Sequence, residues 1–442
     1  MAETPPHSSK AAVGSPIHRP MSLRRNISWS VIGNATYAGL QWLSLIALTK
    51  LQPTSDVGAF TLGLSVATPI VTLLNMELRQ ILSTDHLGRY PLKLFITIRV
   101  VTSIVAVMII ALFAAIGGYD IATGLVIVAV GCYKAIDAIA DITFGYFQQV
   151  ERMTIVAKSL ILNGVLSFVG FSTVLYVTRN LLAGVVAFTI ASVITLVCWN
   201  IPKMQVERLH LRSYHSVYPG ESWNWPEFRR GGAELIASAW PLGAAVMVAN
   251  LGTYVPRYLL EWFEGASSLG IFGALSYLVV IGGVVATAIA YSTLPRMASY
   301  YQSGNRDAYL RIVRSMVAAG IAIILIGEVL VIFAGESVVS MIYTKEYGGY
   351  TPAMMLLVLG GGAGYIATFI SFGLIALEDY RTQLITNLIA LIVLTVAALV
   401  LIPPMGIDGA ALTIAVGAIV RILGMSWMLA SNVSEKFVLR GR

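Results

Sequence analysis

Residues 382–402 read TQLITNLIALIVLTVAALVLI, a run without a single charged side chain. A helix needs about 20 mostly apolar residues to cross the hydrocarbon of a bilayer. The run is continuously apolar and does not alternate, which excludes a strand of a transmembrane β-barrel. Residues 382–402 therefore predict a membrane-spanning helix.

The same pattern recurs along the 442-residue chain, which is 57% hydrophobic and only 12% charged. Soluble domains carry about 25% charged residues. This balance excludes a soluble enzyme, a disordered chain and a disulfide scaffold, because so few charges cannot cover so much apolar surface in water. We predict an all-α membrane protein with twelve transmembrane helices, at 28–49, 58–77, 94–116, 121–147, 155–177, 181–202, 234–262, 267–290, 313–334, 353–377, 382–402 and 406–430.

The twelve predicted helices divide into two bundles of six. The N-terminal bundle covers 22–202, a basic cytoplasmic linker covers 203–233, and the C-terminal bundle covers 234–430. Residues 1–21 are rich in Pro, Ser and Ala and are expected to form a disordered tail, while 431–442 form a second tail. Both tails are expected in the cytoplasm.

The orientation follows from Lys and Arg, which concentrate in cytoplasmic loops. With both termini inside, 22 of the 29 Lys and Arg fall on the cytoplasmic side of an inner membrane. These charges are scattered over seven segments. A nucleic-acid partner is therefore not expected, because it would need the charges on one soluble face.

A weak internal repeat links the two bundles. Asp56-Val57-Gly58-Ala59-Phe60 opens the second span and Ser268-Leu269-Gly270-Ile271-Phe272 opens the eighth. Bundles of six spans enter the membrane in the same direction, so a duplication predicts a pseudo-twofold axis along the membrane normal and a central cleft. The alternative is that the two segments are similar only because membrane helices use a restricted set of residues.

The fourth span carries three charges at bilayer depth, Lys134, Asp137 and Asp141, on one helix face. Each costs about 2.5–3.5 kcal/mol on insertion scales. One interpretation is structural: Lys134 pairs with Asp137, and Asp141 is hydrated. The other is functional: Lys134 attracts an anionic head group, and one of the acids exchanges a coupling cation.

Polar stripes occur in spans one and seven. Asn34 and Gln41 share a face of the first, and Asn250, Tyr254 and Arg257 share a face of the seventh. Such stripes either line water or join helices. Arg257 follows Pro256 near the outer end, so its side chain could also snorkel to the interface.

Three further charges lie within predicted spans. Arg99 and Arg421 lie nearer the cytoplasmic ends and either face the cleft or snorkel. Glu328 has no obvious partner in its span and is a candidate for a protonated buried acid.

Other chemical signals are missing from the sequence. Cys132 and Cys198 lie in apolar runs with no disulfide or metal spacing, and there is no Walker-type phosphate loop. No cofactor and no enzymatic activity are expected. Because acids lie at bilayer depth without an obvious partner, any work done across the membrane is expected to draw on an H⁺ or Na⁺ gradient, as in an antiporter.

Several motifs together carry a family resemblance: Trp240-Pro241-Leu242-Gly243, Tyr254-Val255-Pro256-Arg257-Tyr258, Leu269-Gly270-Ile271-Phe272, Leu294-Pro295-Arg296-Met297-Ala298 and Ile402-Pro403-Pro404-Met405-Gly406. In order and spacing they resemble polysaccharide transporters, the family of O-antigen-type lipid-linked oligosaccharide flippases. That family belongs to the multidrug, oligosaccharidyl-lipid and polysaccharide exporter superfamily. The resemblance covers nearly the whole chain from about residue 22.

The resemblance implies two six-helix lobes, alternating access, and transfer of a polyprenyl-pyrophosphate oligosaccharide to the outer leaflet for exopolysaccharide synthesis. Polysaccharide polymerases and glycosyltransferases are implied partners, besides membrane lipids. Basic residues in the cleft would meet the pyrophosphate. By position the substrate candidates are Lys134 and Arg257, then Arg99 and Arg421, with Asn34, Gln41, Asn250 and Tyr254 lining the cleft; Asp137, Asp141 and Glu328 are the ion-coupling candidates. The alternatives are a multidrug or small-molecule exporter of the same superfamily and a membrane enzyme of surface-glycan assembly.

Overall fold

The computed structural model describes residues 23–85, 89–212, 225–377 and 380–440, so the predicted tail at 1–21 lies outside it. Within these ranges every regular element is helical. The elements are α1 (Leu23–Leu51), α2 (Thr54–Asn75), α3 (Leu78–Thr84), α4 (Leu92–Ile116), α5 (Ile121–Gln149), α6 (Met153–Thr178), α7 (Leu181–Thr195), the π-helix η1 (Leu196–Asn200), α8 (Ile201–Arg212), α9 (Trp225–Gln302), α10 (Arg306–Ile342), α11 (Lys345–Gly348), α12 (Thr351–Ala376) and α13 (Tyr380–Arg440).

Two of these helices are long because each joins two helices across a glycine. Gly265 breaks α9 with φ 82°, and Gly406 breaks α13 with φ 52°. Glycine adopts these angles without the clash that a Cβ would cause. The predicted spans 234–262 and 267–290 thus lie on either side of Gly265 within one continuous element.

Ten helical stretches of the described chain are long and apolar enough to cross a membrane. Asn250–Gln302 of α9 counts as one of these stretches, and so does Gln383–Ser431 of α13. Helix α5, which carries three charges, is not among the ten. The architecture is all-helical and multi-pass, and the number twelve stays a prediction.

Several helices begin at a side chain that caps them. Asp120 accepts a hydrogen bond from the Thr123 backbone N–H at 3.1 Å before α5. Asn180 and Asn305 do the same for α7 and α10, also at 3.1 Å. Each cap satisfies a backbone donor that the first helical turn leaves open. Short polar residues at these positions therefore fix where the helices begin.

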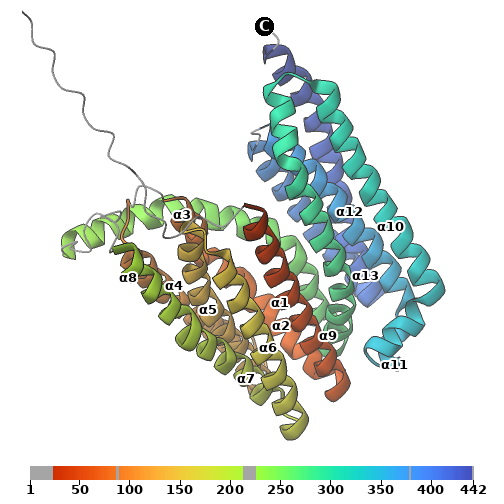
Figure 1. Cartoon of the computed structure of the whole chain (residues 1–442). Coiled ribbons are helices and arrows are strands. Elements are labelled where there is room, and N and C mark those ends of the chain that lie inside the picture. The colour runs from red at the N-terminus through yellow and green to blue at the C-terminus, as the bar shows by residue number, and fades with distance from the viewer. Residues whose placement is uncertain (1–22, 86–88, 213–224, 378–379, 441–442) are drawn as a thin grey trace, which may run out of the picture.

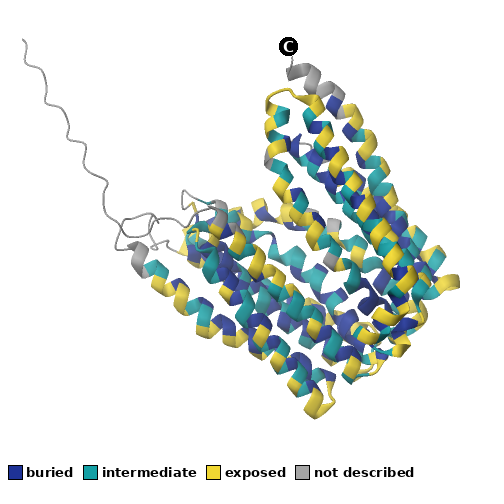
Figure 2. Cartoon of the chain, turned by 45° about the vertical axis from the view of Figure 1, so that its right-hand side comes forward, coloured by how far each residue is buried: buried dark blue, intermediate teal, exposed yellow. Residues whose placement is uncertain are grey.

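The helices form two groups with separate cores (Figures 1 and 2). The cores of the first group draw almost entirely on α1 to α7 and the start of α9, with Phe60, Phe171 and Phe188 packed together. The cores of the second draw on the rest of α9 and on α10 to α13. We call the groups the N-lobe and the C-lobe. The lobes meet at one end and diverge toward the end that carries the C-terminus, which leaves a V-shaped notch.

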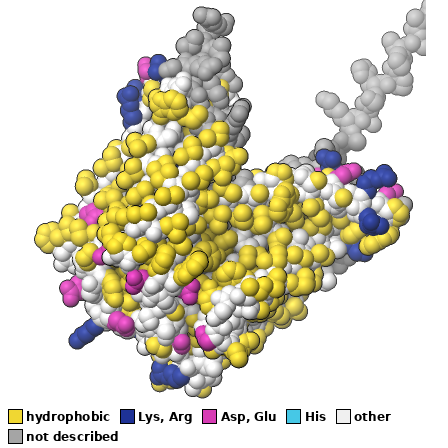
Figure 3. All heavy atoms as spheres, turned by 180° about the vertical axis from the view of Figure 1, so that it is seen from behind, with side chains coloured by type: hydrophobic (Ala, Val, Ile, Leu, Met, Phe, Trp, Pro, Cys, Tyr) yellow, Lys and Arg dark blue, Asp and Glu magenta, His cyan; other side chains and the backbone are white. Residues whose placement is uncertain are grey.

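A broad hydrophobic belt covers the visible outer surface of both lobes (Figure 3). Charged side chains gather at the two ends of the molecule rather than on this belt. An apolar patch of this size is far beyond what a soluble monomer exposes. The surface therefore fits a multi-pass membrane protein.

The lobes join where α2 packs backbone to backbone against α9. A Cβ at Gly58 would overlap the Ala266 backbone, and one at Gly270 would overlap the Thr54 backbone. A Cβ at Gly273 would lie 2.6 Å from the Thr61 hydroxyl oxygen. We call this contact the seam. Beside it, the Trp42 indole N–H donates to the Tyr343 hydroxyl at 3.0 Å, and Lys50 Nζ donates to the Met341 carbonyl at 3.1 Å.

Replacing Gly58 by valine is expected to weaken the contact between the lobes, because its Cβ meets main-chain atoms that cannot rotate away. We expect the melting temperature in detergent to fall by about 5 °C. Gly124→Val is the matched control, since no atom lies within 4 Å of a Cβ there. Equal losses in the two variants would show that helix propensity, and not the seam, explains the effect.

Candidate functional site

The N-lobe contains a cavity of about 200 Å³. It opens among helices α1, α3, α5, α6 and α7 and the π-helix η1. Its polar lining residues are Asn34, Tyr37, Arg79, Asp137, Asp141, Ser159, Asn163, Ser192, Thr195 and Asn200. Two of the three ion-coupling candidates, Asp137 and Asp141, therefore face one space.

Asp137 is held by hydroxyl and amide groups. Its carboxylate accepts hydrogen bonds from the Tyr37 hydroxyl at 3.1 Å, the Ser192 hydroxyl at 3.2 Å and the Asn163 amide at 3.4 Å. The Ser192 hydroxyl also lies 3.2 Å from the Asn163 amide oxygen. A carboxylate at membrane depth that is held by uncharged hydroxyl and amide groups can take up a proton, and carboxylate and hydroxyl oxygens are the ligands that a small hard cation prefers.

The structure does not show the direct pair of Lys134 with Asp137 that one interpretation of the sequence offered. Among the described ion pairs none joins them, and the Lys134 ammonium lies 5.0 Å from the centre of the Tyr133 ring instead. Asp137 turns toward α1, α6 and α7, whose polar groups supply its hydrogen bonds. Lys134 lines neither cavity described here. Three residues of separation placed the two on one side of α5, but the neighbouring helices decide where each side chain points.

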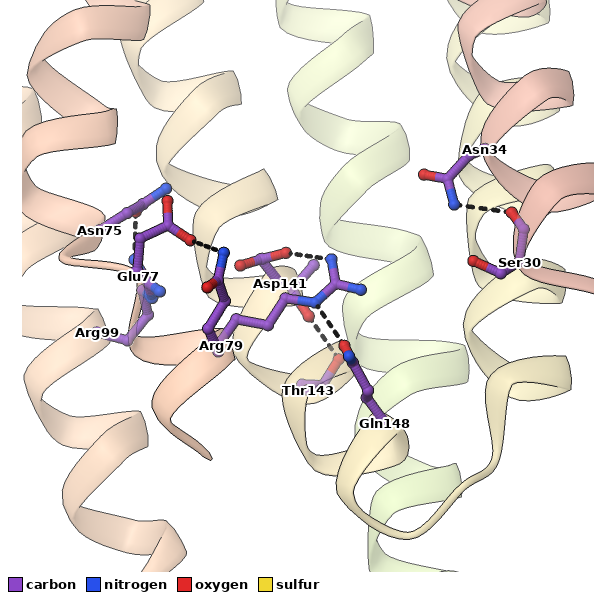
Figure 4. Close-up of polar contacts among 11 residues, drawn as sticks. Ser30, Asn34, Asn75, Glu77, Arg79, Arg99, Asp141, Thr143 and Gln148 are labelled. Atoms are coloured by element: carbon purple, nitrogen blue, oxygen red, sulfur yellow. Dashed lines mark hydrogen bonds and ion pairs between the residues drawn. The ribbon is translucent and has the colours of Figure 1, made fainter. Parts of the chain in front are cut away.

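Gln41 belongs to the same polar network and not to an open cleft. Its side-chain amide donates to the Tyr133 hydroxyl at 2.9 Å, and that hydroxyl lies 3.0 Å from the Tyr37 hydroxyl. Asn34 lines the cavity, with its amide donating to the Ser30 carbonyl at 2.8 Å (Figure 4). The polar stripe of α1 thus joins helices at Gln41 and lines the N-lobe cavity at Asn34.

Asp141 is paired, contrary to its expected role as the unpaired acid. Arg79 from α3 reaches its carboxylate at 2.9 Å and the Gln148 amide oxygen at 3.4 Å (Figure 4). A neutralised carboxylate is a weaker ligand for a coupling cation than a free one. The sequence could not show this pair, because Arg79 lies in a different helix.

Arg99 is buried rather than snorkelling, with 0% of its surface exposed. Its guanidinium donates to the side-chain oxygen of Asn75 (Figure 4), and its Nε and Nη2 have no partner among the described residues. Asn75 ends α2, where Met76 and Glu77 take left-handed angles with φ 48° and 50°. Arg99 therefore braces the turn from α2 to α3, and it lines neither cavity described here.

The C-lobe contains a larger cavity of about 700 Å³, bounded by both halves of α9 and by α12 and α13. Two of its lining residues are basic, Arg257 and Arg421. Among the described lining residues none is acidic. The uncharged polar ones are Asn250, Thr253, Ser276, Thr287, Tyr365, Thr368 and Asn387.

Both arginines have unused hydrogen-bonding capacity. Arg257 is 8% exposed, its Nε has no partner among the described residues, and its guanidinium carbon lies 5.8 Å from the centre of the Tyr254 ring. Arg421 is partly buried, and its Nε likewise has no partner there. Arg257 therefore does not snorkel. Guanidinium groups without a protein partner on one cavity can bind an anion such as a diphosphate, which accepts forked hydrogen bonds.

Glu328 on α10 lines neither of these cavities. Both its carboxylate oxygens are buried without a hydrogen-bond partner in the described chain. The isolation predicted from the sequence is thus seen, but the residue is separate from the Asp137 network.

Sequence reasoning missed several residues of these sites. Tyr133, Asn163 and Ser192 complete the Asp137 network, and Tyr365 and Asn387 line the C-lobe cavity. Their signal is a single polar residue in an apolar helix. That signal is common in membrane helices and does not say which residues meet.

Comparison with known proteins agrees with this architecture. Residues 23–301 match the family described as "Polysaccharide biosynthesis protein". The chain belongs to this family. A capsular polysaccharide biosynthesis protein, CapF of Staphylococcus aureus, is 25% identical over 402 residues, which cover 90% of this chain and 97% of CapF.

Two solved structures share the fold of this chain. The lipid II flippase MurJ in an inward closed conformation matches with a TM-score of 0.74 at 11% identity, over 94% of this chain and 90% of MurJ. An inward-facing multidrug resistance MATE family transporter of the MOP superfamily matches with a TM-score of 0.71 at 13% identity, over 92% and 98%. The fold is therefore that of the MATE and MurJ transporters.

Proposed function

We propose that this protein is a flippase that moves a polyprenyl-diphosphate-linked oligosaccharide from the cytoplasmic to the outer leaflet of the inner membrane. The observation that carries the proposal is the C-lobe cavity with its two arginines and no acid among the described lining residues. Its family and the capsular relative place the chain in polysaccharide biosynthesis. A diphosphate and its sugars cannot cross hydrocarbon alone, because their hydrogen bonds to water would be lost.

The transport cycle is alternating access between the two lobes. The notch opens at the end that carries the C-terminus, which the Lys and Arg distribution assigns to the cytoplasm, while the seam closes the other end. Twelve spans related by a pseudo-twofold axis would let the lobes rock about the seam. Most of the polyprenyl tail stays in lipid while the head group passes through the notch.

An ion gradient of H⁺ or Na⁺ drives the cycle, with Asp137 as the coupling carboxylate. Its hydroxyl and amide neighbours suit either ion. We prefer Asp137 to the other two candidates because Asp141 is paired with Arg79 and Glu328 lines neither cavity. Glycosyltransferases that make the substrate and a polymerase that consumes the product are the implied partners.

Asp137→Asn is expected to abolish the dependence of transport on an imposed ion gradient, because an amide cannot exchange a proton or balance a cation. Transport driven by substrate concentration alone should persist. The measurement compares flipping in vesicles with and without a pH or Na⁺ gradient. Glu328→Gln is the matched control, and loss of gradient dependence only in that control would move the coupling site to α10.

The alternative function is a multidrug exporter of the same superfamily, which the MATE-like fold alone would also allow. It predicts an acidic cavity for cationic drugs, whereas the large cavity here is basic. The deciding experiment reconstitutes the purified protein with a fluorescent polyprenyl-diphosphate oligosaccharide and measures leaflet exchange. Exchange no faster than in empty vesicles, together with drug resistance on expression, would replace the proposal by the alternative.

A further inference from the structure

Much of the C-lobe cavity wall is hydrocarbon. Val280 and Val284 from α9, Leu357 from α12, and Leu391 and Leu394 from α13 all line it. Ligand sites are mostly apolar with a few placed polar groups, and sites of about 300–1,000 Å³ hold ligands of drug size. The cavity, at about 700 Å³, fits a compact ligand with a charged end and an apolar part.

Most of the hydroxyl groups of this cavity already donate their hydrogen to a carbonyl of the protein. Ser276, Thr287 and Thr368 each donate to a carbonyl of the preceding helical turn, at 2.6 to 2.9 Å. The Tyr365 hydroxyl donates to the Val279 carbonyl. The oxygens of these hydroxyls can still accept a hydrogen bond. Among the described lining residues, however, the side-chain donors left for a sugar ring are those of the two asparagines, Thr253 and the arginines, so a sugar would lose part of its bonds to water there.

Three glycines leave open room on this wall. No atom lies within 4 Å of a Cβ built at Gly364, and the nearest atoms at Gly252 and Gly283 lie at 3.8 Å and 3.5 Å. In contrast, Gly360 and Gly417 are close-packed, with neighbours at 2.9 Å and 2.6 Å. Tight packing therefore does not account for glycine at 252, 283 and 364, and their missing side chains leave space in the cavity.

We propose that the C-lobe cavity binds the lipid end of the substrate: the diphosphate on Arg257 and Arg421, and the prenyl units next to it over Gly364. The glycan then stays in the notch between the lobes. This inference rests on the proposed function, since it requires a diphosphate at the two arginines. It names the carrier, a prenyl diphosphate, as the group that the C-lobe recognises.

Recognition of the carrier has a consequence for selectivity. A short prenyl diphosphate without sugar binds and competes with the full substrate, because it fills both the basic and the apolar parts of the cavity. A longer or different glycan on the same carrier leaves this contact unchanged. Gly364 sets the room for the prenyl group, and a bulky side chain at this position removes that room.

The test uses three water-soluble probes on the purified full-length protein: inorganic pyrophosphate, geranyl diphosphate and UDP-N-acetylglucosamine. We expect geranyl diphosphate to bind at least about tenfold more tightly than pyrophosphate, because it also buries hydrocarbon. Gly364→Leu should remove that advantage of about tenfold while pyrophosphate affinity stays unchanged. Gly124→Leu, at a helix glycine with open space outside the cavity, is the matched control and should change neither affinity.

The outcomes separate this inference from the proposed function. If Arg257→Gln leaves pyrophosphate binding unchanged, or if no diphosphate binds the wild type, the anion site itself fails. If pyrophosphate binds through Arg257 but the geranyl group adds nothing, only the prenyl site is overturned. Tighter binding of UDP-N-acetylglucosamine than of geranyl diphosphate would put the glycan in the cavity. The comparison of the probes on the wild-type protein needs no variant. If Gly364→Leu does not fold, Gly364→Ala replaces it, with a smaller expected loss of affinity for geranyl diphosphate.

Discussion

Replacing both Arg257 and Arg421 by glutamine is expected to reduce leaflet exchange of the lipid-linked oligosaccharide by at least about thirtyfold, corresponding to about 2 kcal/mol. Glutamine keeps hydrogen-bonding capacity and removes the charge that would balance a diphosphate in a cavity without an acidic lining residue in the described chain. The measurement is the initial rate of exchange per folded molecule in vesicles. The apparent affinity for substrate should weaken as well.

Arg99→Gln is the matched control for this double variant. Arg99 is the most deeply buried of the three arginines, but it contacts Asn75 and lies outside both cavities. Its replacement should lower thermal stability and leave the exchange rate of the remaining folded protein within about twofold. If Arg99→Gln reduced exchange as strongly as the double variant, the anion site would not be in the C-lobe.

A cross-link across the seam is expected to stop transport completely and reversibly. The Cβ of Thr61 lies 3.2 Å from a Cβ built at Gly273, close to the range of about 3.5–4.5 Å in disulfides. Thr61→Cys with Gly273→Cys, in a background of Cys132→Ala and Cys198→Ala, should form a disulfide under mild oxidation. Because the seam must open for release on the outer side, oxidised protein should bind substrate and fail to exchange it.

Reduction with dithiothreitol should restore exchange to the rate of the unoxidised double variant. The single-cysteine variants, oxidised in the same way, serve as controls, and oxidation should not change their rate of exchange. Exchange that continues with the disulfide fully formed would show that the lobes need not part at the seam. Alternating access about this contact would then be wrong.

In α5 the contacts of the charged residues differ from those that helical spacing suggested. Its sequence placed Lys134, Asp137 and Asp141 on one side of a helix and suggested a pair within it. The structure gives Asp141 to Arg79 of α3 and surrounds Asp137 with groups from α1, α6 and α7. Helical spacing fixes the direction of a side chain only roughly, and the partner is chosen by whichever helix packs opposite.

The arginines of the C-lobe show the same limit over a longer range. Arg257 and Arg421 belong to α9 and α13, and only the packing of these helices with α12 places both on one cavity. From the sequence, each arginine could be considered only separately, as a residue that faces the cleft or as one that snorkels to the interface. The family resemblance grouped them with Lys134 and Arg99 as cleft candidates, and it did not show which of the four share a cavity.

The sequence by itself determined that this is an all-helical, multi-pass membrane protein, because long apolar runs such as 382–402 must satisfy their backbone hydrogen bonds locally in lipid. It also located the charges at bilayer depth, since each is conspicuous in an apolar run. Only the tertiary structure decided that Asp137 meets Tyr37, Asn163 and Ser192, and that Arg257 and Arg421 share one cavity. These groupings depend on helix rotation and on contacts between residues distant in the chain, which local periodicity does not encode.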